Sequence, residues 1–196
     1  MSDANLEEAV KSCVSGAFYA SGQNCVGVKR IFIEEDIYDS FLKKFSQLTS
    51  TLKIGSPLSE DTDIGPIISK VSIRQIDAFI TESKDHGAKL IRGGKIIGNC
   101  YTPTILEADC DNNIANYKEV FGPVVTLSKV KNICQAIACC NKSPFGLHTA
   151  IFTNNINNAH KAINELDCSG VMVNDSSDYR IDSMPFGGVR SSGMGR

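Results

Sequence analysis

The sequence predicts a single α/β domain, in which helices flank a sheet that is mostly parallel or mixed. Two observations lead to this prediction. Segments whose apolar residues recur at helical spacing alternate along the chain with short segments rich in valine and isoleucine, which is the arrangement of βαβ units. The 196 residues also contain no internal repeat, low-complexity tract or linker, so residues 1–196 are expected to form one domain.

Five segments have the spacing of amphipathic helices. In the first, apolar residues recur at helical spacing from Leu6 to Ala17. Glu7 and Glu8 lie in its first turn, where the helix dipole favours acidic groups. The other four follow the same pattern and end near Gly87, near Pro144 or at turn-rich loops. The predicted helices cover residues 5–20, 36–52, 69–86, 134–142 and 157–166.

Short apolar segments between these helices predict the strands. They are rich in valine and isoleucine, which favour extended backbone. Residues 53–67 carry two glycines and two prolines and are expected to form a turn-rich loop. The predicted strands cover residues 28–33, 88–94, 101–108, 122–130, 148–153 and 170–175.

Charge and hydropathy exclude several classes of protein. The 20 Lys+Arg and 22 Asp+Glu give a net charge of −2 and are interspersed, so neither nucleic acid nor an anionic membrane is expected as a partner. No apolar run approaches the about 18 residues of a transmembrane helix. The polar, acidic start, MSDANLEEAV, argues against a secretory signal. We therefore expect a cytoplasmic protein.

The eight cysteines are expected to be reduced thiols. No Cys-x-x-Cys pair is present and the three histidines are scattered, so no zinc or other metal site is expected. Six cysteines lie in apolar or helical contexts, where small buried thiols are common. These six are Cys13, Cys100, Cys134, Cys139, Cys140 and Cys168.

Cys25 differs from those six in its surroundings. The stretch ASGQNC (residues 20–25) is a polar, backbone-permissive corner between a predicted helix and a predicted strand, and loops of this kind carry chemistry. A thiolate here can attack a carbonyl while its own backbone N–H and a nearby amide receive the oxyanion. No base is visible beside it, and a buried structural thiol is the alternative.

Two further segments combine polar and apolar residues in an unusual way. At residues 116–125, Glu119 and Phe121 lead through Gly122 into an apolar strand; a turn with a solvated glutamate and a core phenylalanine explains this equally well. Residues 173–196 form a long polar loop and a glycine-rich tail. Their Gly-Met-Gly is not a dinucleotide fingerprint, because no strand leads into it and no helix follows.

Taken together, three segments resemble the aldehyde dehydrogenase superfamily in their order and approximate spacing. They are FYASGQNCVGVKRIFI (residues 18–33), KEVFGPVV (118–125) and SMPFGGVRSSGMGR (183–196). The intervening IGSPLSEDTDIGPIIS, GAKLIRGG, YTPTIL and SPFGLHTAIFT are similar to connecting segments of that family. The resemblance covers essentially the whole chain and implies a fold of the aldehyde dehydrogenase catalytic-domain type.

The resemblance also implies roles for particular residues. Cys25 falls at the catalytic thiol, which attacks a small aldehyde to give a thiohemiacetal; hydride passes to NAD or NADP, and water hydrolyses the resulting thioester. Glu119 and Phe121 match contacts to the nicotinamide ribose and ring. Cys25, Glu119, Phe121 and Phe186 are expected to share one cleft. The expected substrate pocket comprises Asn24, Asn174, Arg180 and Phe186, with Gly22, Gln23, Gly188 and Gly193 shaping the adjoining loops.

Chains of this family normally contain more than these 196 residues. A preceding Rossmann-type region supplies the adenosine and pyrophosphate contacts, the glutamate that activates water, and the asparagine amide of the oxyanion hole. A final C-terminal segment helps to form the subunit interface. We therefore expect residues 1–196 to be the catalytic domain alone, inactive in isolation, and the full-length form to be a homo-oligomer.

Two other functions remain open at this point. One is a CoA-acylating aldehyde dehydrogenase, in which a thiol takes the acyl group; the other is a non-catalytic paralogue that acts as an assembly partner. The presence of Cys25, Glu119 and Phe121 argues against the paralogue.

Two residues depart from or refine the family pattern. Lys118 stands where the family often has an acidic residue. Arg180 is either a surface arginine or a group at the substrate mouth that favours an anionic aldehyde.

Overall fold

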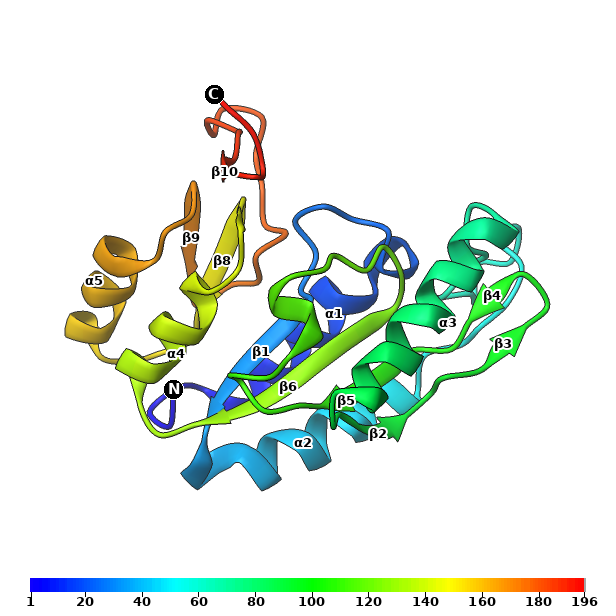
Figure 1. The fold of residues 1–196 in the computed structure, drawn as a ribbon, viewed down its shortest axis with the longest axis horizontal. Coiled ribbons are helices and arrows are strands. Elements are labelled where there is room, and N and C mark those ends of the chain that lie inside the picture. Colours follow the sequence, from blue (N-terminus) through cyan, green and yellow to red (C-terminus); the bar gives the residue numbers. More distant parts are fainter. Residues whose placement is uncertain (196) are drawn as a thin grey trace.

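The computed structural model describes residues 1–195 and has a sheet at its centre with helices on both faces (Figure 1). Arg196, the last residue of the glycine-rich tail, lies outside the described residues. The helices are α1 (Leu6–Phe18), α2 (Glu35–Ser50), α3 (Lys70–Asp85), α4 (Ile133–Asn141) and α5 (Ile156–Glu165), with 3₁₀ turns η1 (Tyr19–Gly22) and η2 (Ile114–Asn116).

The main sheet has the strand order β1-β6-β5-β2. Strands β1 (Arg30–Glu34) and β5 (Thr104–Glu107) run parallel to the central β6 (Val124–Val130), and β2 (Lys89–Arg92) runs antiparallel to β5 at the edge. The prediction of a mostly parallel or mixed sheet is confirmed. Edge strand β2 is antiparallel because no helix separates it from β5, and a parallel pair needs a crossover connection.

Both faces of this sheet are buried, as a sheet of parallel strands requires. Alternate residues of β6 point to opposite sides: Val125 and Leu127 pack with α1 and α2, whereas Val124 packs with α3. All three are 0% exposed. The sheet is therefore a buried middle layer between these helices.

The predicted helices are present with small shifts at their ends. Asn5 caps α1 by accepting hydrogen bonds from the backbone N–H groups of Glu7 and Glu8 (3.2 and 3.3 Å), and Ser69 caps α3. Such caps satisfy donors that the first helical turn leaves free. The first helix ends at Phe18 instead of residue 20, because the chain there turns into the left-handed η1.

The predicted strand at residues 101–108 is wrong as a single element. It divides at Pro103, which has no N–H to donate to a sheet. Before the proline, β4 (Cys100–Tyr101) pairs with β3 (Ile96–Ile97) in a small hairpin; after it, β5 joins the main sheet. Two further short strands, β7 (Phe145–Gly146) and β10 (Val189–Arg190), also pair and were not predicted.

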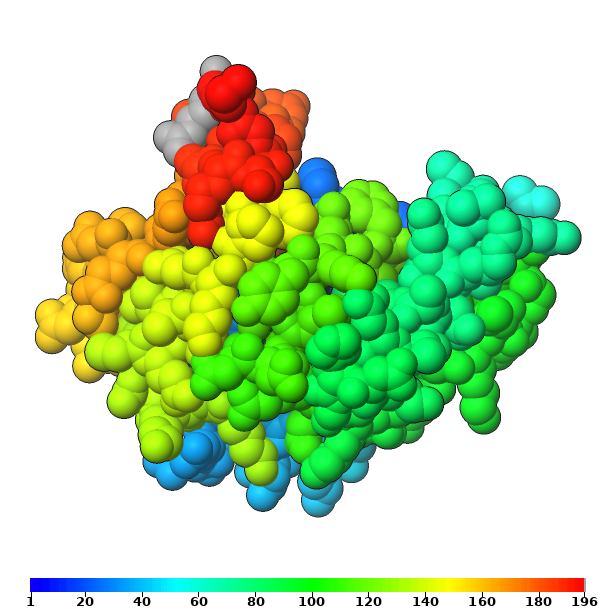
Figure 2. Space-filling model, in the orientation of Figure 1, coloured from blue at the N-terminus to red at the C-terminus, as the bar shows by residue number. Residues whose placement is uncertain are grey.

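A separate parallel pair lies beside the main sheet. Strands β8 (His148–Ile151) and β9 (Gly170–Val173) form this pair, with α5 between them in the chain. Beyond β9 the C-terminal segment projects from the body of the molecule (Figure 2), and Met194 near its end is fully exposed. Within residues 1–195, every helix is too short or too polar to span a bilayer.

Candidate active site

The loop that carries Cys25, residues 19–29, contains three consecutive left-handed residues near its start. Ala20 (φ 51°), Ser21 (φ 58°) and Gly22 (φ 68°) follow α1 after one extended residue, Tyr19. A non-glycine residue in this region costs about 1 kcal/mol or more. The buried Ser21 hydroxyl donates to the Gly65 carbonyl at 3.0 Å, which helps to hold the turn. Backbone strain of this kind concentrates at functional sites.

Side chains on the N-terminal side of Cys25 hold this Cys25 loop while the thiol stays exposed. The Gln23 amide oxygen accepts a hydrogen bond from the N–H of Ile68 (2.9 Å), and the Asn24 amide oxygen accepts one from the N–H of Val26 (3.2 Å). Cys25 itself is exposed. Among residues 1–195, neither the backbone N–H of Cys25 nor the side-chain amide N–H of Asn24 has a hydrogen-bond partner, so both donors remain available to a bound molecule.

The Cys25 loop is in backbone contact with a second loop. A Cβ atom added to Gly22 would overlap the carbonyl group of Gly122. Gly122 lies in the connection between β5 and β6, residues 108–123, which we call the Glu119 loop. Both the positive φ of Gly22 and this close approach exclude any side chain. The two loops are therefore fixed to each other through their backbones.

Lys29, at the end of the Cys25 loop, connects these two loops through its side chain. Its Nζ donates a hydrogen bond to the Gly22 carbonyl and lies 5.5 Å from the centre of the Phe121 ring. Burial lowers the pKa of Lys29 to about 8, and the nearby Glu119 carboxylate and Cys25 thiol offset only part of that effect. Within residues 1–195, Lys29 has no ion-pair partner.

Glu119 and Phe121 present their side chains to solvent. Glu119 is exposed and has no ion pair or hydrogen bond from its carboxylate within the described chain, and Phe121 is 45% exposed. Lys118, where the family often has an acidic residue, forms an ion pair with Glu82 on α3 (2.5 Å). The charge of Lys118 is therefore already satisfied, and the Glu119 carboxylate remains available.

Cys25, Lys29 and Glu119 line a common cavity of about 470 Å³. A volume of this size is typical of sites for small molecules. His148 on β8 also lines this cavity. Phe121 does not line this cavity; it lies with Glu119 in a neighbouring depression beside α3. The structure thus brings together the thiol, an ammonium group and a free carboxylate.

Phe186 and Arg180 lie together at the far side of His148. The Phe186 ring packs edge-on against the His148 ring, with 5.5 Å between centroids, and the Arg180 guanidinium lies 4.9 Å from the Phe186 ring centre. Phe186 does not line the main cavity but contacts a residue that does. Arg180 also lies 3.9 Å from the Asp182 carboxylate, a weak and exposed pair.

Asn174 directs its side chain to the end of β8. Its amide oxygen accepts a hydrogen bond from the N–H of Thr153 (2.9 Å), and its amide nitrogen donates to the Thr153 carbonyl (3.0 Å). Its backbone is left-handed, with φ 59°. Both polar ends of the side chain are therefore engaged with the protein, and Asn174 does not line the cavity that Cys25 faces.

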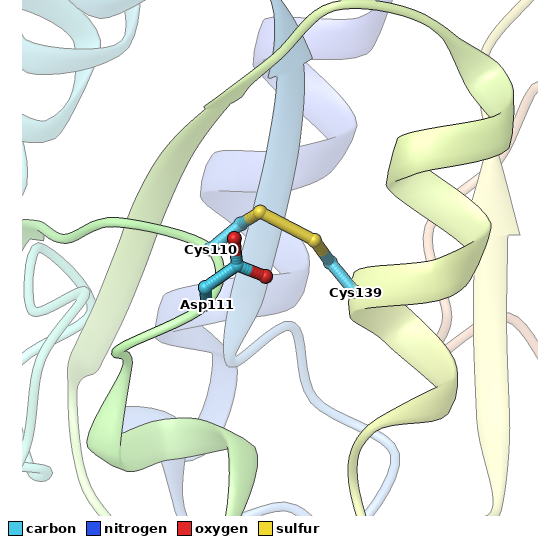
Figure 3. Close-up of side chains that lie close together, drawn as sticks. All are labelled: Cys110, Asp111 and Cys139. Atoms are coloured by element: carbon cyan, nitrogen blue, oxygen red, sulfur yellow. A yellow bond between two sulfur atoms is a disulfide. The ribbon is translucent and has the colours of Figure 1, made fainter.

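The expectation that all cysteines are free thiols is wrong for one pair. Cys110 and Cys139 form a disulfide, with 5.8 Å between their Cα atoms (Figure 3). They are separated by 29 residues in the chain, so their proximity depends on the tertiary fold. Cys134 is also not buried but exposed. Cys110, Asp111 and Cys139 form the one cluster of potential metal-ligating groups within residues 1–195, and the disulfide engages both sulfurs.

Sequence reasoning missed two residues of this region. The predicted strand at residues 28–33 contains Lys29 and Arg30 among apolar residues, and charged residues in such a segment are a signal that they have specific partners. His148 gave no signal, because its neighbours in the chain are ordinary strand residues; only the fold places it between the cavity and Phe186.

Comparison with known proteins gives consistent matches over the whole chain. A lactaldehyde dehydrogenase of Methanococcus aeolicus is 43% identical over 196 residues, which are 100% of this chain and 42% of the relative. An aspartate-semialdehyde dehydrogenase of Pseudomonas canavaninivorans is 42% identical with the same coverage. This chain therefore spans about two fifths of the length of the curated relatives it matches.

A solved structure shows the same fold at high similarity. The glyceraldehyde-3-phosphate dehydrogenase of Methanocaldococcus jannaschii, crystallised with NADP, superposes with a TM-score of 0.95 and 42% identity, over 99% of this chain and 42% of that one. The sequence profile of the aldehyde dehydrogenase family matches residues 1–196, the full length of the chain. The chain therefore belongs to the aldehyde dehydrogenase family.

Proposed function

We propose that these residues are the catalytic domain of an NAD(P)-dependent aldehyde dehydrogenase that oxidises a small aldehyde to a carboxylate. The observation that supports this proposal most directly is the position of Cys25. Its exposed thiol lies on a strained loop and borders a cavity that Glu119 also lines, and the N–H donors of Cys25 and Asn24 have no partner within residues 1–195.

In the proposed reaction, the Cys25 thiolate attacks the aldehyde carbonyl and forms a thiohemiacetal. The carbonyl oxygen gains negative charge in this step, and preorganised N–H donors stabilise such charge. The backbone N–H of Cys25 and the amide N–H of Asn24 have no other partner among residues 1–195, which suits them to this role. Hydride loss then leaves a thioester on Cys25, which water hydrolyses.

The nicotinamide cofactor, NAD or NADP, would be held in part by Glu119 and Phe121. The Glu119 carboxylate is exposed and unpaired within residues 1–195, as an acceptor for ribose hydroxyls must be, and the Phe121 ring has a solvent-facing surface for a planar ring. When bound, the nicotinamide accepts the hydride. The Nζ of Lys29 lies 5.5 Å from the centre of the Phe121 ring and donates to the Gly22 carbonyl, so it links the Phe121 ring to the Cys25 loop.

The substrate class is supported by the surroundings of Phe186. Arg180, stacked near this ring, offers a cation that can pair with a carboxylate or phosphate on a small aldehyde. Relatives are named for lactaldehyde, aspartate semialdehyde and glyceraldehyde 3-phosphate. We propose a small polar aldehyde of this kind as the substrate, with Asn24, Arg180 and Phe186 in its pocket and Asn174 fixing the adjoining strand ends.

The remaining steps need groups beyond these residues. The family resemblance assigns the contacts to adenosine and pyrophosphate, and the glutamate that activates water, to a Rossmann-type region outside these 196 residues. Positioning of reactants is worth roughly 7–11 kcal/mol and a general base about a hundred- to ten-thousandfold. We therefore expect the 196 residues alone to show negligible aldehyde-dependent reduction of NAD or NADP, and the full-length enzyme to act as a homo-oligomer.

An activated ester tests the proposed chemistry of Cys25 without a cofactor. Mixing the chain with p-nitrophenyl acetate should release a burst of nitrophenolate that approaches one equivalent, because only the thiolate and the oxyanion donors are needed to form the acyl-thiol. Cys25→Ser should abolish the burst, and Cys134→Ser, which removes another exposed thiol, should leave it unchanged. A burst that survives Cys25→Ser would contradict the proposal.

The same assay distinguishes the proposed dehydrogenase from a CoA-acylating enzyme and from a non-catalytic paralogue. A CoA-acylating enzyme would give the same burst, followed by rapid acyl transfer to added coenzyme A in place of slow hydrolysis. A non-catalytic paralogue would give no burst above that of a small free thiol. Measuring nitrophenolate release with and without coenzyme A therefore separates all three.

A further inference from the structure

The disulfide between Cys110 and Cys139 lies apart from Cys25 and has no role in the proposed reaction. Cys110 belongs to the Glu119 loop and Cys139 to α4. The two residues are 2% and 1% exposed, and they pack with Val130, Phe32 and Ala136 in a small apolar cluster. This pair of sulfurs joins two elements that are distant in the chain.

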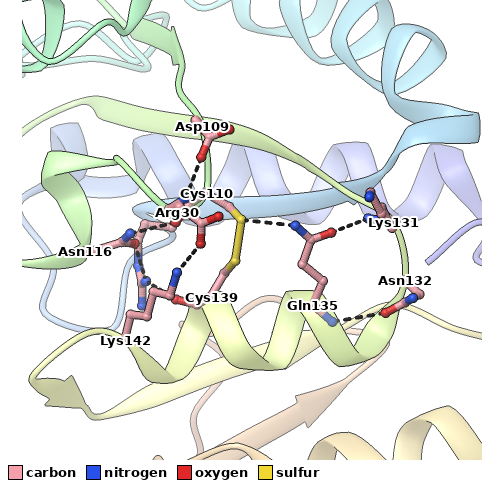
Figure 4. Close-up of a disulfide and its surroundings, with 10 residues drawn as sticks. Arg30, Asp109, Cys110, Asn116, Lys131, Asn132, Gln135, Cys139 and Lys142 are labelled. Atoms are coloured by element: carbon pink, nitrogen blue, oxygen red, sulfur yellow. Dashed lines mark hydrogen bonds and ion pairs between the residues drawn. A yellow bond between two sulfur atoms is a disulfide. The ribbon is translucent and has the colours of Figure 1, made fainter.

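The same two elements are also connected without the sulfurs (Figure 4). Arg30 donates hydrogen bonds to Asn116 in the Glu119 loop (2.9 Å) and to the Cys139 and Cys140 carbonyls at the end of α4 (3.3 and 3.2 Å). Lys142 forms an ion pair with Asp111. Because these links do not involve the thiol groups, the fold is held when the sulfurs are reduced, and two thiols fit the apolar cluster as small hydrophobic groups.

The Glu119 loop itself has little regular structure. Apart from η2 it has no helix or strand between Ala108 and Pro123. Asn116 donates to the Cys110 carbonyl (2.9 Å), so the residues just after Cys110 are tied back to it. The same loop then continues to Glu119 and Phe121 and to the backbone contact between Gly122 and Gly22. A covalent link at Cys110 therefore limits motion at the start of a loop whose end reaches the candidate active site.

We propose that Cys110 and Cys139 are a reversible oxidation site, at which a peroxide or a low-molecular-weight disulfide converts two buried thiols into a tether between the Glu119 loop and α4. Oxidation adds a covalent restraint to the non-covalent links of the Glu119 loop, and reduction by a dithiol removes that restraint. Any effect of oxidation on cofactor contacts rests on the proposed function, because that function assigns Glu119 and Phe121 to the nicotinamide. Formation of the disulfide tether does not depend on the proposed function.

The oxidation is balanced when hydrogen peroxide is the oxidant. One thiolate attacks the peroxide, the O–O bond breaks, and a sulfenic acid and one water form. The second thiolate then attacks that sulfur, the S–S bond forms, the S–O bond breaks and a second water leaves. Two electrons pass from the two thiols to the peroxide. With glutathione disulfide, one thiolate attacks it to form a mixed disulfide and releases one glutathione; the second thiolate then attacks the protein sulfur, the S–S bond forms and the other glutathione leaves. In the reverse direction a dithiol attacks the disulfide and is itself oxidised.

Cys134 provides a matched control for this site. It lies on the same helix as Cys139, but it is exposed and has no sulfur partner within the described chain. An oxidant that acts only by access would modify Cys134 and Cys25 before the buried pair. If the apolar cluster opens locally, however, oxidation of one of the two buried thiols is followed by rapid disulfide formation with the other. This is favoured because the Cα atoms of Cys110 and Cys139 are already at disulfide spacing, 5.8 Å.

The experiment compares the reduced and oxidised forms of the 196-residue chain in a Cys25→Ser background. The protein is fully reduced, treated with one equivalent of hydrogen peroxide or with glutathione disulfide, alkylated and digested without reductant. Tandem mass spectrometry should identify a cross-link of Cys110 to Cys139, retained in Cys134→Ser and lost in Cys139→Ser. Hydrogen exchange of backbone amides at residues 111–121 should be about tenfold slower in the oxidised form.

Two results would overturn the proposal. One is oxidation confined to Cys134, Cys140 or Cys168 while Cys110 and Cys139 remain thiols. The other is a cross-link with no change of exchange in residues 111–121. If Cys139→Ser does not fold, the comparison of the reduced and oxidised forms of the parent protein still tests whether the cross-link forms and slows exchange. Since neither readout uses catalysis, failure here is distinct from failure of the ester burst that tests the proposed function.

Discussion

The Cys25 loop and the Cys110–Cys139 pair place sulfur in opposite environments. Cys25 is exposed on a left-handed loop at the edge of a cavity, whereas Cys110 and Cys139 are 2% and 1% exposed in an apolar cluster. A thiol on an exposed, strained loop is accessible to solutes. A thiol in a packed apolar cluster contacts only the neighbouring protein groups, here the partner thiol. The backbone around each cysteine, more than the cysteine itself, determines the chemistry available to it.

The two regions are also held together by different forces. The Cys25 loop depends on backbone contacts and hydrogen bonds, such as those of Gly22 and Gln23. The disulfide region depends on apolar packing and on the guanidinium of Arg30. Substitutions in the Cys25 loop should therefore change reactivity strongly, while those around the pair should mainly change mobility.

The largest effect is expected from Gly22→Ala. The new Cβ would overlap Gly122 and would require alanine at φ 68°, which we expect to lower the free energy of unfolding by about 3 kcal/mol. The displaced loop should also slow the ester burst by about a hundredfold or more, because the thiol and the oxyanion donors no longer align. Urea denaturation and stopped-flow absorbance measure the two effects.

Gly65→Ala is the matched control for this substitution. A Cβ atom there has nothing within 4 Å, so stability and burst rate should remain close to those of the parent chain. If Gly22→Ala behaves like Gly65→Ala, the backbone contact between the two loops is not needed for the reactivity of Cys25.

The second expected effect is a large spread of alkylation rates among the cysteines. With a small amount of iodoacetamide, Cys25 should react first, because it is exposed beside free N–H donors. Cys13 should react at least about a hundredfold more slowly, since burial raises its pKa to about 12 and leaves little thiolate at neutral pH. Peptide mapping at short times gives the order.

Cys134 decides whether access alone explains this order, as it is exposed too. Equal rates at Cys25 and Cys134 would mean that the Cys25 loop adds nothing to reactivity. In protein that is fully reduced before labelling, faster alkylation of Cys139 or Cys168 than of Cys25 would contradict the assignment of the nucleophile.

A smaller effect is expected from the pH dependence that Lys29 contributes. Burial lowers its pKa from 10.5 to about 8 in the folded chain. Between these two values the unfolded chain binds the proton and the folded chain does not, so the stability contributed by this group rises with pH. Relative to Lys29→Met, the parent chain should gain about 1 kcal/mol per pH unit between pH 8 and pH 10.

Urea denaturation at several pH values measures this difference. Lys43→Met, at an exposed position of α2, is the control and should run parallel to the parent. A constant difference between the parent and Lys29→Met across this range would show that Lys29 keeps its charge in the folded state.

Much of the fold could be predicted from the sequence because its determinants are local. The caps Asn5 and Ser69 and the helical spacing of apolar residues define α1 and α3 to within about two residues at each end. The division of one predicted strand at Pro103 could also have been anticipated, since proline cannot donate to a sheet.

The site was only partly accessible to such reasoning. Cys25 and Glu119 stand in recognisable motifs, and the fold places them on one cavity. The pairing of Cys110 with Cys139 depends on how β5, the Glu119 loop and α4 meet, and no local pattern encodes it. The burial of Lys29 likewise arises from neighbours such as Phe121, about ninety residues away in the chain.

The smallest expected effect concerns Asn174, for which the resemblance suggests a place in the substrate pocket while its contacts suggest a clamp between β8 and β9. Asn174→Ala removes two hydrogen bonds to Thr153 and puts alanine at φ 59°, so it should cost about 1–2 kcal/mol of unfolding free energy. Asn174→Gly, which keeps the backbone freedom and loses only the hydrogen bonds, should cost about half as much. Because both amide ends already face Thr153, the ester burst should change by less than about twofold in either variant. A burst reduced tenfold at unchanged stability would instead assign Asn174 to the pocket, and would imply that its side chain turns away from Thr153 when substrate binds.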